Sequence, residues 1–163
     1  MSKIYIGKIV NTHGIKGEVK ILSNVSNKDK IFVPGNKIYI GNDMEIIDRY
    51  RHHKIFDMIK IKGIDNINDV LKYKGCKVYI DIEEIGIKDN EYILEELVGY
   101  NINNEGKILG KVREIVYNNG NTLLGIDYDR NYYIPYSYIV DVNKKERVVN
   151  TKDVEGLILW ELI

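Results

Sequence analysis

The chain has 163 residues, 44% of them hydrophobic, and a formal net charge of zero, which is typical of ordinary globular proteins and argues against a disordered chain. The sequence shows no apolar run near the ~20 residues that span a bilayer, and its start alternates like a strand rather than a signal peptide. We therefore expect a cytoplasmic protein with no membrane partner. A single cysteine, Cys76, excludes an internal disulfide and a multi-cysteine zinc site.

The zero net charge hides an asymmetry between the two halves of the sequence. Residues 1–85 contain 15 Lys and Arg against 11 Asp and Glu, whereas residues 86–163 contain 9 against 13. A basic half favours a phosphate backbone through counterion release, and an acidic half favours a basic protein. The counts indicate two different partners, although two solvated surfaces with a chance imbalance would give the same numbers.

The first half predicts a run of short strands with turns between them. The strand-like segments are 4–10, 18–22, 37–40, 44–48, 55–62 and 76–80. A helix is predicted over residues 65–75, which have a polar N-cap candidate and a C-terminal glycine, while residues 24–30 form a polar excursion. Because closure removes exposed edge strands, we expect an antiparallel barrel over residues 1–85.

Basic and aromatic side chains gather in two places in this half. His13 and Lys16 lie beside glycines in the loop 12–17, a candidate phosphate-facing tip. The run 49–54 adds cations and a stacking ring, so the predicted RNA-facing residues are His13, Lys16, Arg49, Arg51 and His52. Ordinary solvated hairpin tips remain the alternative. The neighbours His52 and His53 point to opposite faces of a strand, so no metal site is expected there.

Residues 86–96 are predicted to be a linker with a binding role. A polar run, 88–91, is followed by apolar side chains at a spacing closer to a helical turn than to a strand. The predicted protein-binding residues are Tyr92, Ile93, Leu94 and Leu97. The alternative is that these side chains only anchor the core of the second half.

Residues 97–163 predict a second small barrel. A long strand, 107–117, has a bulge or bend at Gly110, and a hairpin turn is expected at 118–121. Pro135 keeps its strand from lying in the interior of a sheet, and the tail 154–160 is expected to pack back on the barrel. Eight of the 13 tyrosines, Tyr128 among them, lie from residue 86 onward, which suits a protein interface as well as a barrel wall. The predicted fold is therefore mainly all-β: two small antiparallel β-barrels, a short linker and one short helix in the first barrel.

The stretch 7–20, Gly-Lys-Ile-Val-Asn-Thr-His-Gly-Ile-Lys-Gly-Glu-Val-Lys, closely resembles the opening signature of the RimM family of ribosome maturation factors, and 63–75 is similar to the end of that family's N-terminal barrel. The second half resembles a PRC-barrel in Glu91-Tyr92, Leu97-Val98-Gly99, Gly106, Gly110, Val112, Ile134-Pro135 and Glu155-Gly156-Leu157. The family often has a Tyr-Tyr pair in its linker, and Ile93 stands at the second position here. The resemblance then implies that partner binding rests on Tyr92, with Ile93 supplying apolar contact.

The resemblance implies a non-enzymatic assembly factor, acting as a monomer without a cofactor. Its implied partners are the head of the immature 30S subunit, 16S rRNA and the small-subunit ribosomal protein of the S-nineteen family, and its implied role is to chaperone maturation and 16S rRNA processing. A general two-barrel RNA-binding module of the translation machinery is the first alternative. The second is an enzyme using His13 or His53 with a carboxylate such as Asp57, for which the sequence offers no catalytic motif.

Overall fold

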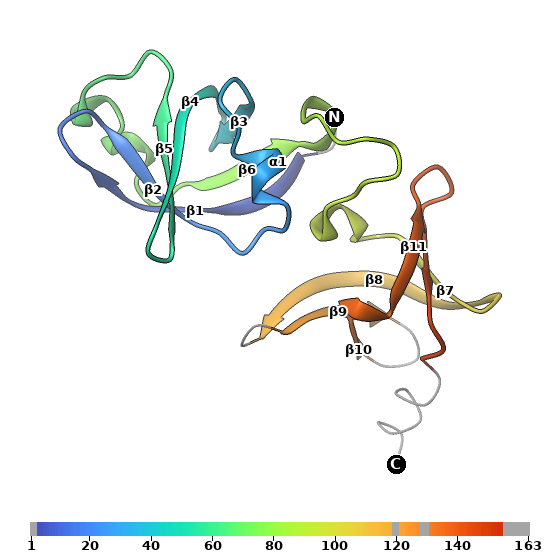
Figure 1. Ribbon diagram of the computed structural model, residues 1–163. Coiled ribbons are helices and arrows are strands. Elements are labelled where there is room, and N and C mark those ends of the chain that lie inside the picture. The colour runs from blue at the N-terminus through green and yellow to red at the C-terminus, as the bar shows by residue number, and fades with distance from the viewer. Residues whose placement is uncertain (1–2, 119–120, 128–130, 155–163) are drawn as a thin grey trace. The chain divides into compact units, whose positions relative to one another are not determined.

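The computed structural model describes residues 3–118, 121–127 and 131–154 (Figure 1). The chain divides into two compact units, Met1–Ile87 and Lys88–Ile163. Of the predicted linker, residues 86–87 belong to the first unit and residues 88–96 to the second. The tail 155–163, the tip of the hairpin at 119–120 and Tyr128 lie outside the described residues, and so does the predicted packing of the tail.

The first unit is a closed barrel in which the strands follow the order β1-β2-β5-β4-β3-β6. Its strands are β1 Lys3–His13, β2 Glu18–Leu22, β3 Lys37–Ile40, β4 Asp43–His53, β5 Phe56–Ile61 and β6 Lys77–Asp81. The first strand pairs with the last, Tyr5 opposite Tyr79, so β1 and β6 have no free edge. Inward positions are mostly isoleucine and valine, for example Ile9, Ile21 and Ile59, and these side chains are fully buried.

The helical content of the first unit differs from the prediction. Residues 65–75 form two 3₁₀ turns, η1 Ile67–Asp69 and η2 Leu71–Tyr73, and not an α-helix. The Asn66 side chain accepts from the backbone N–H of Asn68, and such local bonds compete with helix formation. The single α-helix among the described residues is α1, Lys28–Ile31, inside the predicted polar excursion. It forms because Ile31 and the following Phe32 are buried by the barrel.

The second unit is a six-stranded sheet in the order β10-β9-β8-β7-β12-β11. Its strands are β7 Asn101–Asn104, β8 Lys107–Asn118, β9 Asn121–Asp127, β10 Asn131–Pro135, β11 Ile139–Asn143 and β12 Val148–Thr151. The 3₁₀ turns η4 Leu94–Leu97 and η5 Tyr136–Tyr138 belong to this unit, and the turn η3 Ile82–Glu84 ends the first unit. In the part of the chain that the structure describes, the pairing does not close β10 against β11. The pair of β7 with β12 is parallel, whereas the sequence predicted antiparallel pairing throughout.

Two local predictions in this unit are confirmed. Two residues of β8, Leu109 and Gly110, oppose one residue of β7, and the φ of Gly110 is 103°, so the strand has a bulge there. The strand that ends at Pro135, β10, is an edge strand. A core of Ile102, Leu124 and Ile126, with further apolar side chains, holds the sheet together. Within the described ranges, no helix is long and apolar enough to cross a membrane.

Candidate RNA-facing and protein-binding surfaces

Positively charged side chains gather where the β1–β2 and β4–β5 hairpins meet. The rings of His13 and His53 are 6.5 Å apart between centroids. The pKa of His53 is lowered, first by burial and then by the positive charges of Arg51, Lys54, His13 and Lys20. We call His13, Lys20, Arg51, His53 and Lys54 the basic cluster.

Strand register explains why these side chains share one outer face of the barrel. Lys20 on β2 and Arg51 on β4 both lie opposite Met58 on β5. Met58 is fully buried although it lies on this outer face, because the long side chains around it cover it. This part of the outer face therefore presents cationic side chains on either side of a buried apolar one.

The carboxylate of Glu18 orients Arg51 within the basic cluster. The guanidinium of Arg51 donates to Glu18 through Nε at 3.0 Å and through Nη2 at 2.9 Å. The pKa of Glu18 is lowered, first by this hydrogen bonding, and also by the charges of Arg51, His13 and Arg49. The side chain of Arg51 remains 47% exposed, so it presents charge to solvent while held in one orientation.

Arg49 and Lys16 lie close to the basic cluster, near a second carboxylate. Lys60 donates to Asp65 at 2.8 Å, and the pKa of Asp65 is lowered by that bond first, with Arg49 and Lys16 also contributing. Both Arg49 and Lys16 are exposed. The structure thus brings four of the predicted RNA-facing residues, His13, Lys16, Arg49 and Arg51, to neighbouring positions.

The fifth predicted residue, His52, is separated from them. Its Nδ1 lies 3.2 Å from Oδ1 of Asp57, a carboxylate with no exposed surface, whereas His53 lies in the basic cluster. The two histidines point to opposite faces of β4, as predicted, so His52 lies outside the basic cluster, and its role in RNA binding stays a prediction. Strand alternation offered the signal, since positions 49, 51 and 53 share a face.

Asp57 is the centre of a buried polar group. The hydroxyl of Tyr50 donates to its Oδ1 at 2.6 Å, and Lys28 of α1 lies 2.8 Å from its Oδ2. The pKa of Tyr50 is raised, first by burial and then by its bond to Asp57. The ring of Tyr50 also stacks on Phe32 at 5.1 Å between centroids. This group attaches α1 to the barrel, which explains why a charged residue is tolerated there.

The predicted protein-binding segment divides into buried and half-buried side chains. Ile93 and Leu97 have no exposed surface, so neither can touch a partner in this conformation. Tyr92 and Leu94 are partly exposed and pack against the core of the second unit. Burial raises the pKa of Tyr92. The predicted contact through Ile93 therefore needs correction, and the candidate surface narrows to Tyr92 and Leu94.

Glu96 fixes the backbone of this segment. Its carboxylate accepts from the backbone N–H of Ile93 at 3.2 Å and pairs with Lys144 at 3.1 Å. On the neighbouring position, Glu95 accepts from the hydroxyl of Tyr117, whose pKa is raised first by burial and then by that bond. Both acidic residues are hydrogen-bonded or ion-paired, so the backbone that follows Tyr92 is held in one conformation. Among the described residues, no group of three His, Cys, Asp or Glu side chains could hold a metal ion.

A closed barrel with a basic cluster on its outer face, followed by a separate second sheet, defines a two-unit, mainly β protein. Residues 4–85 match the model of the RimM N-terminal domain. A ribosome maturation factor RimM from Staphylococcus haemolyticus is 34% identical, over 96% of this chain and 99% of its own length. The same-named protein of Oceanobacillus iheyensis is also 34% identical, over 96% and 97%.

The chain belongs to the RimM family. A crystal structure described as a 16S ribosomal RNA processing protein RimM from Pseudomonas aeruginosa is 21% identical, with a TM-score of 0.47 over 93% of this chain and 97% of that one.

Proposed function

We propose that this protein is a non-enzymatic, cytoplasmic ribosome assembly factor that binds the immature small subunit as a monomer. Its basic first unit faces 16S rRNA in the head of the subunit, and its acidic second unit, with Tyr92 and Leu94, holds the ribosomal protein of the S-nineteen family. Occupying the immature conformation disfavours misfolded alternatives, and this assists maturation and 16S rRNA processing. The names of the relatives support a role in ribosome assembly.

The basic cluster is the observation that carries the RNA half of this proposal. The pKa of His53 is lowered first by burial and then by the neighbouring cations, so these side chains lie close enough together to repel one another. Phosphate groups relieve that repulsion, and each neutralised phosphate also releases condensed counterions. An arginine held by Glu18 loses less side-chain entropy when it binds, which favours a specific geometry.

A hydrolytic or acid–base enzyme receives less support from the same residues. The histidine beside Asp57 is His52, and not His13 or His53 as that alternative requires. Asp57 is also surrounded by Tyr50 and Lys28, which use its oxygens for structure. The remaining alternative, a general RNA-binding module, differs from our proposal in lacking the ribosomal-protein partner.

The test uses the full chain and an rRNA fragment from the head of the small subunit. Arg51→Gln and Lys16→Glu should each weaken binding and lower the steepness of its salt dependence by about one unit for each lost phosphate contact. Lys74→Glu, which changes an exposed lysine of the loop before β6, serves as the matched control. Equal affinities for all three variants would contradict the assignment of the basic cluster.

A second readout follows the His53 ring by NMR titration. RNA phosphates beside the basic cluster should raise the pKa of His53, because they oppose the positive charges that lower it in the free protein. The ring of His52, on the other face of β4, provides the internal comparison. An unchanged His53 pKa in the presence of bound RNA would show that RNA binds elsewhere.

A further inference from the structure

A row of tyrosines crosses the outer face of the first barrel over β1, β6 and β3. Tyr5 on β1 lies opposite Tyr79 on β6, and Tyr79 lies opposite Tyr39 on β3. The rings of Tyr5 and Tyr79 meet edge to face, with centroids 5.8 Å apart. Tyr5 remains 49% exposed, and Met44, opposite Tyr39 on β4, extends the row with 48% exposure. An exposed ring, Tyr5, in register with the partly exposed rings of Tyr79 and Tyr39 is more than an isolated surface residue.

A bulge in β1 places a lysine on the same face as this row. Strict alternation would turn Lys8 inward, because Tyr5 points outward. The register shifts by one residue between Tyr5 and Gly7, so Lys8 lies opposite Lys77 and both are exposed. The hydroxyl of Ser23 donates to the carbonyl of Ile6 and so satisfies the polar group at the bulge.

The tight packing at Gly7 shows how this bulge is maintained. A Cβ added at Gly7 would lie 2.6 Å from the carbonyl oxygen of Leu22, which real Cβ atoms do not approach so closely. The bulge therefore requires glycine at this position. The lysine row, Lys8 and Lys77, and the tyrosine row run side by side across β1 and β6.

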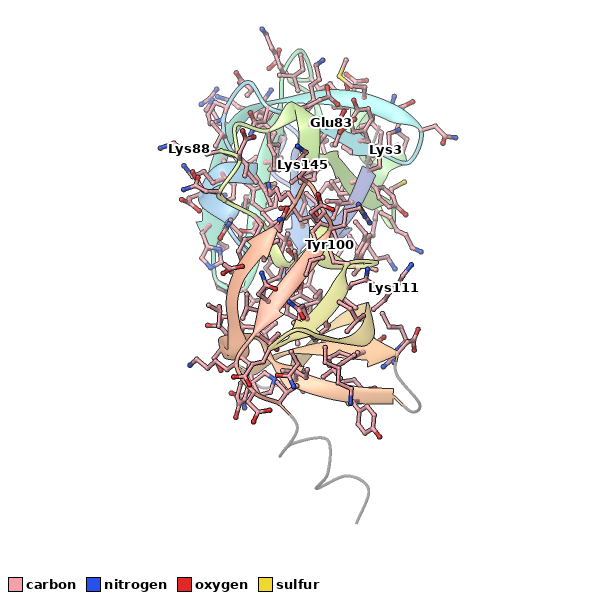
Figure 2. The ribbon with its side chains drawn as sticks, turned by 90° about the vertical axis from the view of Figure 1, so that its right-hand side faces the viewer. Lys3, Glu83, Lys88, Tyr100, Lys111 and Lys145 are labelled. Carbon is pink, nitrogen blue, oxygen red and sulfur yellow. The ribbon has the colours of Figure 1, made fainter. Side chains whose placement is uncertain are left out.

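Charge around the tyrosines is mainly positive. Lys3 lies 4.2 Å from the centroid of the Tyr39 ring, and Figure 2 shows Lys3 and Glu83 on the same side of the first unit. Lys37 pairs with Glu84 at 3.0 Å, and Glu84 also accepts from the Tyr39 hydroxyl, raising the pKa of Tyr39 to about 12. Four exposed lysines, Lys3, Lys8, Lys37 and Lys77, thus lie around the tyrosines, against the carboxylates of Glu83, Glu84 and the buried Asp81.

We propose that this face, defined by Tyr5, Tyr39, Tyr79, Lys8 and Lys77, is a second binding site that takes a single-stranded segment of RNA. A base stacks on the exposed ring of Tyr5, which Tyr79 supports from its edge, and the lysine row meets the phosphates on either side of that base. Proteins that bind single-stranded RNA combine aromatic rings, on which bases stack, with cations that follow the phosphate backbone. In a duplex the faces of the bases are already stacked on one another and are not available. The site rests on the proposed function for its ligand class only, since it uses none of the residues of the basic cluster.

The test measures binding of the full chain to a labelled, unstructured ten-nucleotide uridine-rich RNA and to a fully paired RNA hairpin. Tyr5→Ala should weaken binding to the single strand by roughly tenfold, as the loss of one stacked base predicts. Tyr5→Phe keeps the ring and should bind almost as the parent does. Tyr136→Ala removes a tyrosine with 50% exposure from the second unit and is the matched control. Lys8→Gln should make binding of the single strand less dependent on salt, while the ring of Tyr5 stays in place.

The outcomes separate this site from the basic cluster. Loss of head-fragment binding in Arg51→Gln with normal binding of the uridine-rich strand is expected if both proposals hold. If Arg51→Gln binds the head fragment with unaltered affinity while Tyr5→Ala binds the uridine-rich strand more weakly, only the proposed function is overturned. Equal affinities of Tyr5→Ala and Tyr136→Ala for the single strand would overturn this inference. Displacement of the RNA by an acidic peptide at lower concentration than by unlabelled RNA would also overturn it, in favour of a protein partner.

Discussion

Arg51 on β4 reaches over β5 to Glu18 on β2, and its guanidinium donates two hydrogen bonds to the carboxylate at 3.0 and 2.9 Å. Each of the two residues lies near a hairpin tip, so the pair joins the tips across an intervening strand. The fork of the guanidinium matches the carboxylate, and a lysine at position 51 would not reproduce both bonds. The orientation of the main cation in the basic cluster thus depends on an acidic residue.

Breaking this pair should have a small, pH-dependent effect on stability. The folded protein lowers the pKa of Glu18 below its ordinary value of 4.5, so the pair stabilises the fold above that pH and the contribution is lost as the pH falls through the lower folded value. Arg51→Ala should therefore lower the melting temperature slightly at pH 7 and leave it unchanged near pH 2. Melting curves at the two pH values check this. An equal decrease at both would point to lost packing over Met58.

His53 should give the opposite kind of proton linkage. The pKa of His53 is lowered in the folded protein, so near pH 6 the unfolded chain binds more protons than the folded one. The free energy of unfolding should then fall as the pH decreases from 7 toward 5. His53→Gln should make this decrease shallower. Urea titrations at several pH values measure it, and identical pH profiles for His53→Gln and the parent would contradict the prediction.

Asp57 should be the most sensitive charged position in the first unit. Asp57→Ala leaves Tyr50 and Lys28 without their buried acceptor and should lower the free energy of unfolding by about 3 kcal/mol. Asp29→Ala, at an exposed position of α1, should change it little. Amide NMR signals from the first unit, followed through a urea titration, give both values. Similar midpoints for the two variants would show that the buried group contributes little.

Two glycines without positive φ offer a matched test of packing. Gly7→Ala should destabilise the first unit by about 1–3 kcal/mol, because the added methyl group meets the backbone of β2. Gly86→Ala adds the same group in open space and should be neutral or slightly stabilising. Comparable melting temperatures for the two variants would mean that β1 and β2 separate at little cost.

Tyr92 tests the protein partner. Tyr92→Ala should weaken binding to the ribosomal protein by ~2 kcal/mol, about thirtyfold, if its half-buried ring is a binding hot spot. Tyr92→Phe should retain most of the affinity, and rRNA binding should be unchanged in both variants. Calorimetric titration with parallel melting curves separates the roles. Normal affinity, or a large loss of stability, would show that Tyr92 only anchors the core.

The burial of Ile93 changes what is expected from restoring a tyrosine there. A tyrosine at position 93 has no exposed surface to occupy and must enter a filled interior. Ile93→Tyr should therefore lower the melting temperature, as overpacking does, instead of tightening partner binding. Ile93→Val, a smaller change in shape, should cost about 1 kcal/mol. A tighter complex without loss of stability would show that the segment rearranges on binding.

Local patterns predicted the strands well, because alternation, turns and special residues act over a few positions. The bulge at Gly110 and the edge strand ending at Pro135 follow from backbone chemistry alone. The short α1 was missed because its cause is not local: Ile31 and Phe32 become buried only when the barrel forms. The helix predicted over 65–75 was wrong, because the Asn66 side chain binds the backbone of Asn68 and favours a 3₁₀ turn.

The candidate surfaces were predictable as sets of residues and not as arrangements. Charge counting indicated that the first half is basic, and the loop 12–17 and the run 49–54 do meet. Which histidine joins the basic cluster depends on the register of β4 with β5. Whether an apolar linker residue is exposed depends on the packing of the whole unit, so Ile93 looked available in the sequence and is buried in the fold.

The parallel pairing of β7 with β12 has a consequence for how the chain is made. Asn103 on β7 donates to Asn150 on β12 at 2.9 Å, across a separation of 47 residues. β12 also lies between β7 and β11 in the sheet, so one edge of β7 and both edges of β11 lack a partner until β12 has been synthesised. The first barrel has all its strands once β6 has left the exit tunnel, whereas the second sheet acquires β12, an interior strand, last. During translation the first unit can fold alone, and the strand edges of the second stay exposed to chaperones, or to other chains, until synthesis is nearly finished.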